Sequence, residues 1–151
     1  MHKITPFLWF DDQAEQAMGF YVSIFKNSKV LSVHPGPNGK AMSVTFELEG
    51  QAFMAVNGGP EFKFTEAISL FVSCKTQEEV DDLWARLTAD GGEESRCGWL
   101  KDKYGLWWQI IPTALIQMMG DSDPVKAKRV VDAMLTMRKI DIKGLREARD
   151  R

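Results

Sequence analysis

Residues 3–25, KITPFLWFDDQAEQAMGFYVSIF, join a strand pattern directly to a helix pattern. The apolar, aromatic run from Lys3 to Phe10 predicts a strand. Beyond Asp11-Asp12, apolar residues recur at the spacing of one helix face, namely Ala14, Ala17, Met18, Tyr21 and Phe25. The stretch therefore predicts a strand followed by a helix, a unit that can be sought again further along the chain.

The remainder of the first half predicts three more strands. Residues 29–34 form a short β-branched segment, and the glycine- and proline-rich turn at 35–39 starts a hairpin. Residues 42–48 alternate apolar and polar side chains, as a half-buried strand does, and Gly50-Gln51 turns the chain into a last strand at 52–57. The predicted order of elements is βαβββ.

The second half repeats this order. Residues 67–73 predict a strand, and Thr76-Gln77-Glu78-Glu79 is a capping box before a helix that carries Val80, Leu83, Trp84 and Leu87. Gly91-Gly92 ends the helix, and short strands are expected at 94–97, 99–103 and 106–111. Ile4-Thr5 aligns with Ile68-Ser69 at an offset of 64 residues, and Phe20-Tyr21 with Leu83-Trp84 at 63. Two copies of one unit explain the repeat, with chance similarity of two βα units as the alternative.

Beyond Pro112 the pattern is helical. A helix is expected at 113–119, and a second one begins with Asp123 as N-cap and Pro124 at the first helical position. Residues 139–151 are highly charged, which predicts a short, fraying helix with a solvated basic face. We therefore expect an α+β fold in one domain, 1–151: module one at 1–60 and module two at 65–112 in a pseudo-twofold arrangement, with a C-terminal helical extension at 113–151.

Composition excludes several classes of protein. The 151 residues are 44% hydrophobic and 26% charged, with a formal net charge of -2, so the chain lacks the basic footprint of a nucleic-acid-binding protein. No apolar run approaches the roughly 20 residues that cross a bilayer, and the N-terminus lacks a signal-peptide core, so we expect a cytoplasmic protein with no membrane partner. Cys74 and Cys97 lack the spacing of a zinc or redox site and are interpreted as reduced, structural thiols.

Several motifs resemble one superfamily. Residues 4–11, ITPFLWFD, resemble the opening strand of PhnB-like members of the vicinal-oxygen-chelate (glyoxalase/bleomycin resistance/dioxygenase) superfamily, and residues 102–110, DKYGLWWQI, resemble their closing hairpin. The strongest resemblance lies in the tail, so that nearly the whole chain is covered. Its motifs resemble the group often labelled 3-demethylubiquinone-9 3-methyltransferase, namely IPTAL at 111–115, Asp123-Pro124, Ala133-Met134-Leu135 and Lys139-Ile140-Asp141-Ile142.

The resemblance implies a ligand cavity between the two modules. Metal-dependent members of this superfamily place their ligands, typically His and Glu, on the first and fourth strands of each module. The corresponding positions here are Thr5 or Pro6, Met54, Ser69 and Gln109, none of which is a histidine or a carboxylate. His2 and His34 fall outside these positions. We therefore expect no metal and no cofactor.

The lining of that cavity is expected to be aromatic. The strand parity that directs Thr5, Ser69 and Gln109 inward directs four rings to the same side, namely Phe7, Trp9, Phe71 and Trp107. Glu47 is the one strand carboxylate that could face the cavity. Because it alternates with the apolar Phe46 and Leu48, it could equally well face solvent. The rings suit a small planar or apolar ligand, with Met54 also lining the site. The alternative is that the rings simply fill space between the modules.

These expectations favour a small-molecule-binding protein in which no catalytic residue can be assigned. A metal-dependent lyase, isomerase or dioxygenase of the same superfamily is the first alternative, and a methyltransferase, which rests on the family label alone, is the second. A homodimer is also expected, with Val130, Met134 and Met137 on an amphipathic helix as candidate contacts. Alternatively, that helix folds back on its own sheet.

Overall fold

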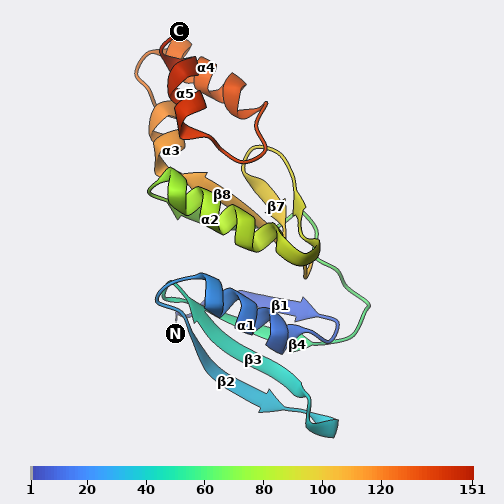
Figure 1. Cartoon of the computed structure of the whole chain (residues 1–151). Coiled ribbons are helices and arrows are strands. Elements are labelled where there is room, and N and C mark those ends of the chain that lie inside the picture. The colour runs from blue at the N-terminus through green and yellow to red at the C-terminus, as the bar shows by residue number, and fades with distance from the viewer. Residues whose placement is uncertain (1) are drawn as a thin grey trace. The chain divides into compact units, whose positions relative to one another are not determined.

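The computed structural model describes residues 2–151, with Asn38 described by its backbone only. The chain forms two compact units, one that ends at Phe64 and one that spans residues 65–151 (Figure 1). Each unit contains a four-stranded sheet with a helix on one face. No helix in the described part of the chain is long and apolar enough to cross a membrane.

The first unit is a βαβββ module. Its elements are β1 (Phe7–Phe10), α1 (Ala14–Ile24), β2 (Lys29–Pro35), a short 3-10 turn (Pro37–Gly39), β3 (Ala41–Leu48) and β4 (Gln51–Asn57). The strands are ordered β1-β4-β3-β2, with β1 parallel to β4 and the other pairs antiparallel. Tyr21 on α1 is fully buried and lies beside Phe46, so the helix packs on the sheet as the apolar spacing predicts.

The second unit repeats this arrangement and adds three helices. Its elements are β5 (Leu70–Cys74), α2 (Gln77–Thr88), β6 (Glu93–Glu94), β7 (Trp99–Lys101), β8 (Trp107–Pro112), α3 (Thr113–Met119), α4 (Pro124–Met134) and α5 (Ile142–Arg149). The sheet is ordered β5-β8-β7-β6, which matches the order of the first sheet strand for strand. The predicted α+β class, with two βαβββ modules and a C-terminal helical extension, is confirmed.

The strands that open each module begin later than predicted. β1 starts at Phe7 and β5 at Leu70, whereas Ile4 and Ile68 are 85% and 65% exposed. Pro6 has no N–H group to donate to a neighbouring strand, although its carbonyl still accepts a hydrogen bond from the Met54 N–H at 2.9 Å. The paired register of β1 with β4 therefore begins at Phe7, and Thr5 lies before it. Ser69 likewise lies before β5.

The sixth strand is also shorter than predicted, because its backbone turns toward the extension. Cys97 has a left-handed φ of 57°, and its N–H donates to the Met137 carbonyl at 2.8 Å rather than to a sheet neighbour. The next N–H, of Gly98, donates to the Arg138 carbonyl at 2.8 Å. These two bonds end the predicted strand 94–97 at Glu94.

The capping box of α2 forms in part. The Thr76 hydroxyl accepts a hydrogen bond from the Glu79 N–H at 3.1 Å, as predicted. The Glu79 carboxylate reaches one residue further back and accepts from the Lys75 N–H at 3.3 Å. Helix α1 has no side-chain cap of its own, and instead the Asn57 side chain, at the end of β4, accepts from the Ala14 N–H at 2.8 Å.

The extension builds a small core of its own on the end of β8. Its buried members are Ile111, Leu115, Met118, Val130, Ile140, Ile142 and Leu145. Val130 is fully buried here, so the prediction that it contacts a second copy is wrong. Met134 and Met137 pack against the same cluster but remain half-buried, and their part in a dimer stays a prediction. The short helix expected within residues 139–151 is α5, whose basic residues Lys143 and Arg146 are exposed as predicted, while Leu145 and Ala148 are buried.

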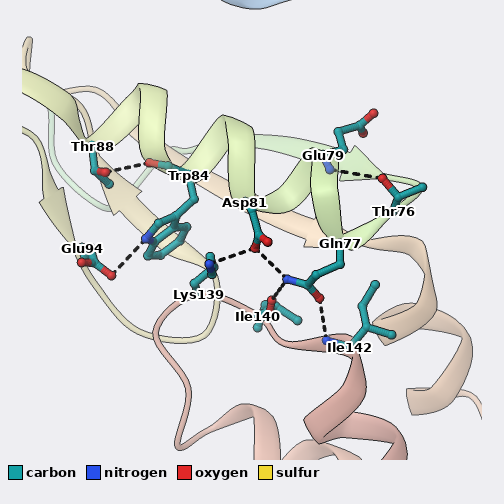
Figure 2. A network of polar contacts seen from close by, with 10 residues as sticks. All are labelled: Thr76, Gln77, Glu79, Asp81, Trp84, Thr88, Glu94, Lys139, Ile140 and Ile142. Carbon is teal, nitrogen blue, oxygen red and sulfur yellow. Dashed lines mark hydrogen bonds and ion pairs between the residues drawn. The ribbon is translucent and has the colours of Figure 1, made fainter.

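A polar network joins this extension to α2 (Figure 2). The Gln77 side chain donates to the Ile140 carbonyl at 2.9 Å and accepts from the Ile142 N–H at 2.8 Å, so one amide satisfies two backbone groups. One turn further along, Asp81 pairs with Lys139 at 2.9 Å. The segment 139–142 is thereby held against the N-terminal half of α2, which the sequence pattern did not predict.

Candidate functional site

Each sheet has one face packed on its helix and one face turned away from it, which we call the far face. In module one, Leu8 and Phe10 are buried on the helix side, and Phe7 and Trp9 alternate with them onto the far face. Register places Met54 beside Phe7, and Thr45 beside Met54. Strand parity thus brings together residues that the sequence analysis assigned to one lining.

Trp9 has structural partners within its own module. Its indole N–H donates to the Gly59 carbonyl at 2.9 Å, and its ring meets Phe62 edge-on with centroids 4.9 Å apart. A Cβ atom at Gly58 would lie 2.3 Å from the indole, so only glycine allows the chain to cross this ring. We conclude that Trp9 anchors residues 58–62, in addition to any contact with a ligand.

Glu47, the carboxylate singled out from the sequence, lies half-buried on the far face of module one. It pairs with Lys29 across the strand at 3.8 Å. Glu47 therefore has a counter-ion on its own sheet.

Thr5 lies before β1, where its hydroxyl donates to the His2 carbonyl at 3.3 Å.

The far face of module two is centred on Gln109. Its amide donates to the Ser69 hydroxyl at 2.9 Å, and both side chains are half-buried. Phe71 and Trp99 are the cross-strand neighbours of Gln109 on β5 and β7. Phe71 is 51% exposed, and Trp99 is half-buried. A hydrogen-bonded polar pair is thus flanked by aromatic rings that remain partly accessible.

The next row of this face carries charge. Trp107 is paired in register with Lys101, whose ammonium lies 5.9 Å from the centroid of the indole ring. Lys101 also pairs with Glu93 on β6 at 3.3 Å. This geometry combines a cation–π contact with a partly solvated ion pair.

Sequence reasoning missed Trp99 and Lys101 as site residues. Both alternate with Leu100, which is fully buried on the helix side. This period-two alternation is the feature of the sequence that could have placed Trp99 and Lys101 on the far face. The segment 99–103 was predicted as a strand without a pairing partner. Only its antiparallel register with β8 places Trp99 next to Gln109.

The two modules carry equivalent pairs with reversed charge. Lys29 on β2 faces Glu47 on β3, and Glu93 on β6 faces Lys101 on β7. The polarity of the ion pair is therefore opposite at the corresponding positions of the two sheets.

Cys74 faces the helix side of its sheet and is fully buried. Burial, and then the nearby Glu79 carboxylate, raise the pKa of the Cys74 thiol to about 12. Tyr104, in the turn before β8, also has a raised pKa, because of burial and then the Asp102 charge. A protonated, buried Cys74 thiol is a poor nucleophile, in agreement with its predicted structural role.

The donor groups at the expected metal positions do not suit a divalent ion. Met54 offers a thioether, Ser69 a hydroxyl and Gln109 an amide, and the last two bond to each other. Across residues 2–151 there is no group of three or more His, Cys, Asp or Glu side chains arranged to hold a metal. His34 lies exposed on β2 opposite Ser43, away from these positions.

Two solved structures of low sequence identity share the fold of this chain. A Pseudomonas aeruginosa protein is 18% identical with a TM-score of 0.63 over 74% of this chain and 98% of its own. The fosfomycin resistance protein FosX of Listeria monocytogenes, solved with Mn(II) and sulfate, is 16% identical with a TM-score of 0.54 over 72% of this chain and 89% of its own. Both likenesses concern the fold alone.

Closer similarity identifies the family. The model of the 3-demethylubiquinone-9 3-methyltransferase family matches residues 2–111. A Bacillus cereus PhnB protein, described by the same family name, is 36% identical with a TM-score of 0.69 over 74% of this chain and 99% of its own. The chain therefore belongs to this PhnB-like family.

The tail was expected to carry the strongest part of the family resemblance, yet residues 112–151 lie outside the range that the family model matches. The resemblance therefore rests on the two modules. No curated protein matches the sequence.

Proposed function

We propose that this protein binds a small planar or apolar organic molecule on the far faces of its sheets, without a metal. One observation carries the proposal. On module two, the Gln109–Ser69 pair lies among Phe71, Trp99 and Trp107, all of them partly accessible. Such a mixture of aromatic area with few polar groups is typical of small-molecule sites.

The energetic basis is apolar contact oriented by one amide. Stacking that removes roughly 150 Å² of apolar surface from water contributes about 4 kcal/mol, at about 25 cal/mol per Å². A free energy of about 4 kcal/mol corresponds to a Kd of about 1 mM, and the lost freedom of the ligand offsets part of it, so affinity no tighter than about millimolar is expected from stacking alone. Gln109 has a second N–H and a carbonyl oxygen to align the polar end of a ligand.

The test uses naphthalene-2-carboxamide, a neutral planar probe, titrated by calorimetry. Trp107→Ala should weaken its binding several-fold while the circular dichroism spectrum stays unchanged, and Gln109→Leu should mainly alter the preference among polar probes. Phe20→Ala is the matched control, because Phe20 is a half-buried ring on α1. Loss of folding in Trp107→Ala, with equal probe binding by Gln109→Leu and the parent, would show that these rings are core.

The alternatives make different demands. A metal-dependent lyase, isomerase or dioxygenase needs fixed N or O ligands, and near-stoichiometric manganese, zinc, nickel or iron in untagged protein would favour it.

A methyltransferase needs a cofactor site, usually a glycine-rich turn in a doubly wound parallel sheet. These sheets are mixed, and no two glycines in the chain are separated by a single residue. Calorimetric binding of S-adenosylmethionine would overturn this argument.

We also propose a homodimer, although not through Val130 as first expected. Support comes from an exposed apolar strip at the edge of the first sheet, made of Val30, Val33 and Met42, which are 47%, 40% and 51% exposed. Strand β2 is an edge strand and leaves backbone groups available to a second copy. Light scattering at micromolar concentration should give twice the chain mass, and Val33→Lys should lower it. A monomeric mass for the parent would refute the dimer.

A further inference from the structure

We infer that Lys101 makes the far face of module two selective for planar organic anions, such as aromatic carboxylates. This inference rests on the proposed function and adds a ligand class to it. Its starting point is the row Trp107–Lys101–Glu93, in which register places three side chains on adjacent strands. The ammonium of Lys101 lies over the Trp107 ring, 5.9 Å from its centroid, so a flat ligand that stacks on this ring comes next to the ammonium.

Charges on this face are few. Register and parity place Ser69, Phe71, Trp107, Gln109 and Trp99 on it, all of them uncharged, together with Lys101 and Glu93. Glu94, the neighbour of Glu93, instead accepts a hydrogen bond from the Trp84 indole on the helix side at 3.0 Å. Lys101 is therefore the one cation among these side chains, and it adjoins the rings.

The present partner of Lys101 can be replaced by a ligand. Glu93 is 66% exposed at its side chain and belongs to a two-residue edge strand, while the Lys101 side chain is 33% exposed. Such solvated ion pairs contribute at most about 1 kcal/mol. When the carboxylate of a ligand takes the place of Glu93 beside Lys101, Lys101 keeps a counter-ion. The ligand also gains apolar contact because it stacks on the Trp107 indole. An organic cation lacks this advantage, because Glu93 lies at the outer edge, one strand beyond Lys101.

Strand geometry sets the size of the ligand. Adjacent strands lie about 4.8 Å apart, and residues two apart on one strand about 6.8 Å, so Lys101, Trp107 and Gln109 span roughly the length of two fused rings. A ligand with its anionic group at one end can stack on Trp107 and reach Lys101 with that group. Gln109, which already donates to Ser69, can meet a second polar group on the ligand.

The experiment compares three probes of the same shape and different charge: naphthalene-2-carboxylate, naphthalene-2-carboxamide and 2-naphthylmethylammonium. The carboxylate should bind about tenfold more tightly than the carboxamide, the ratio that one hydrogen bond to a charged group supplies. High ionic strength should reduce this ratio. The ammonium probe should bind most weakly.

Variants assign the preference to Lys101. Lys101→Met should bring the carboxylate down to the affinity of the carboxamide, Lys101→Arg should keep most of the preference, and Glu93→Gln should strengthen carboxylate binding. Lys103→Met is the matched control, because Lys103 lies two residues away and pairs with Asp90 at 3.9 Å. Equal affinity of acid and amide in the parent, or a preference that survives in Lys101→Met, overturns the inference while the binding function stands. If none of the probes binds, the proposed function fails and the inference with it.

Discussion

Asp102 holds together the turn that leads into β8, and its replacement tests this account of the fold. The carboxylate is 1% exposed. One oxygen accepts from the N–H groups of Tyr104 and Leu106 at 2.8 and 3.1 Å, and the other accepts from the Trp108 indole at 2.8 Å. A single side chain thus satisfies two turn amides and a buried indole.

The expected cost of Asp102→Ala follows from these partners. Hydrogen bonds to a charged group contribute about 1.5–3 kcal/mol each, and part of this is recovered because the buried carboxylate no longer has to be desolvated. Leu106 and Trp108 are both 2% exposed, so their N–H groups cannot turn to water, whereas Tyr104 is only half-buried. We expect a loss of about 3–5 kcal/mol, a large share of the roughly 5–15 kcal/mol that stabilises a domain. Asp102→Asn keeps one acceptor but turns an amide N–H toward the indole N–H, so it should cost about 1–3 kcal/mol.

Urea unfolding followed by circular dichroism measures both losses through the transition midpoint. Asp82→Ala is the control, because Asp82 forms an exposed pair with Arg86 at 3.7 Å and should change stability by less than about 0.5 kcal/mol. If Asp102→Ala costs less than about 1 kcal/mol, or no more than Asp102→Asn, the assignment of Asp102 as the acceptor for this turn is wrong.

Two further predictions concern other parts of module two. The folded pKa of Cys74, about 12, exceeds the ordinary value of 9.0, so the unfolded chain loses this proton first as pH rises. The free energy of unfolding should therefore be unaffected by Cys74 below about pH 9 and fall by up to about 1.4 kcal/mol per unit toward pH 12, a decline that Cys74→Ala should reduce in alkaline urea titrations. An unchanged slope would contradict the pKa. Gln77→Leu should accelerate hydrogen exchange at the Ile142 N–H, whereas Lys139→Met, which removes only a surface pair, should leave it nearly unchanged; equal exchange in both variants would argue against this attachment.

The sequence predicted elements where local pattern decides them. The period-two alternation of residues 42–48, the Thr76 cap and the Asp123–Pro124 start of α4 all need only neighbouring residues, and each is present in the structure. The capping of α1 by Asn57 could not be predicted, because a residue 43 positions away supplies the acceptor. The indole partner of Asp102 was not predicted either, although Trp108 lies only six positions away, because the motif indicates the turn but not which side chain its carboxylate meets.

The sequence indicated which side chains of a strand share a face, but it did not indicate which strands pair with each other. Phe71 and Gln109 were predicted to share a face, and their register makes them neighbours. Trp99 and Lys101 were not assigned to the site, because the pattern of a three-residue strand is too short to show that β7 pairs with β8. For α4, an amphipathic face predicts burial but not the partner that covers it, and here α3, α5 and the end of β8 cover Val130.

The extension bears on the candidate site although the family match ends before it. Gly98, which directly precedes Trp99, has a left-handed φ of 84°, and a Cβ atom there would lie 2.7 Å from Ile111 and 3.1 Å from Ile140. The N–H groups of Cys97 and Gly98 both donate to carbonyls of the extension. The backbone that enters β7 is therefore positioned by residues 137–140, and β7 carries both Trp99 and Lys101. Loss of this attachment would free the first residue of β7 to move, so a segment outside the matched range helps to set the geometry of the far face.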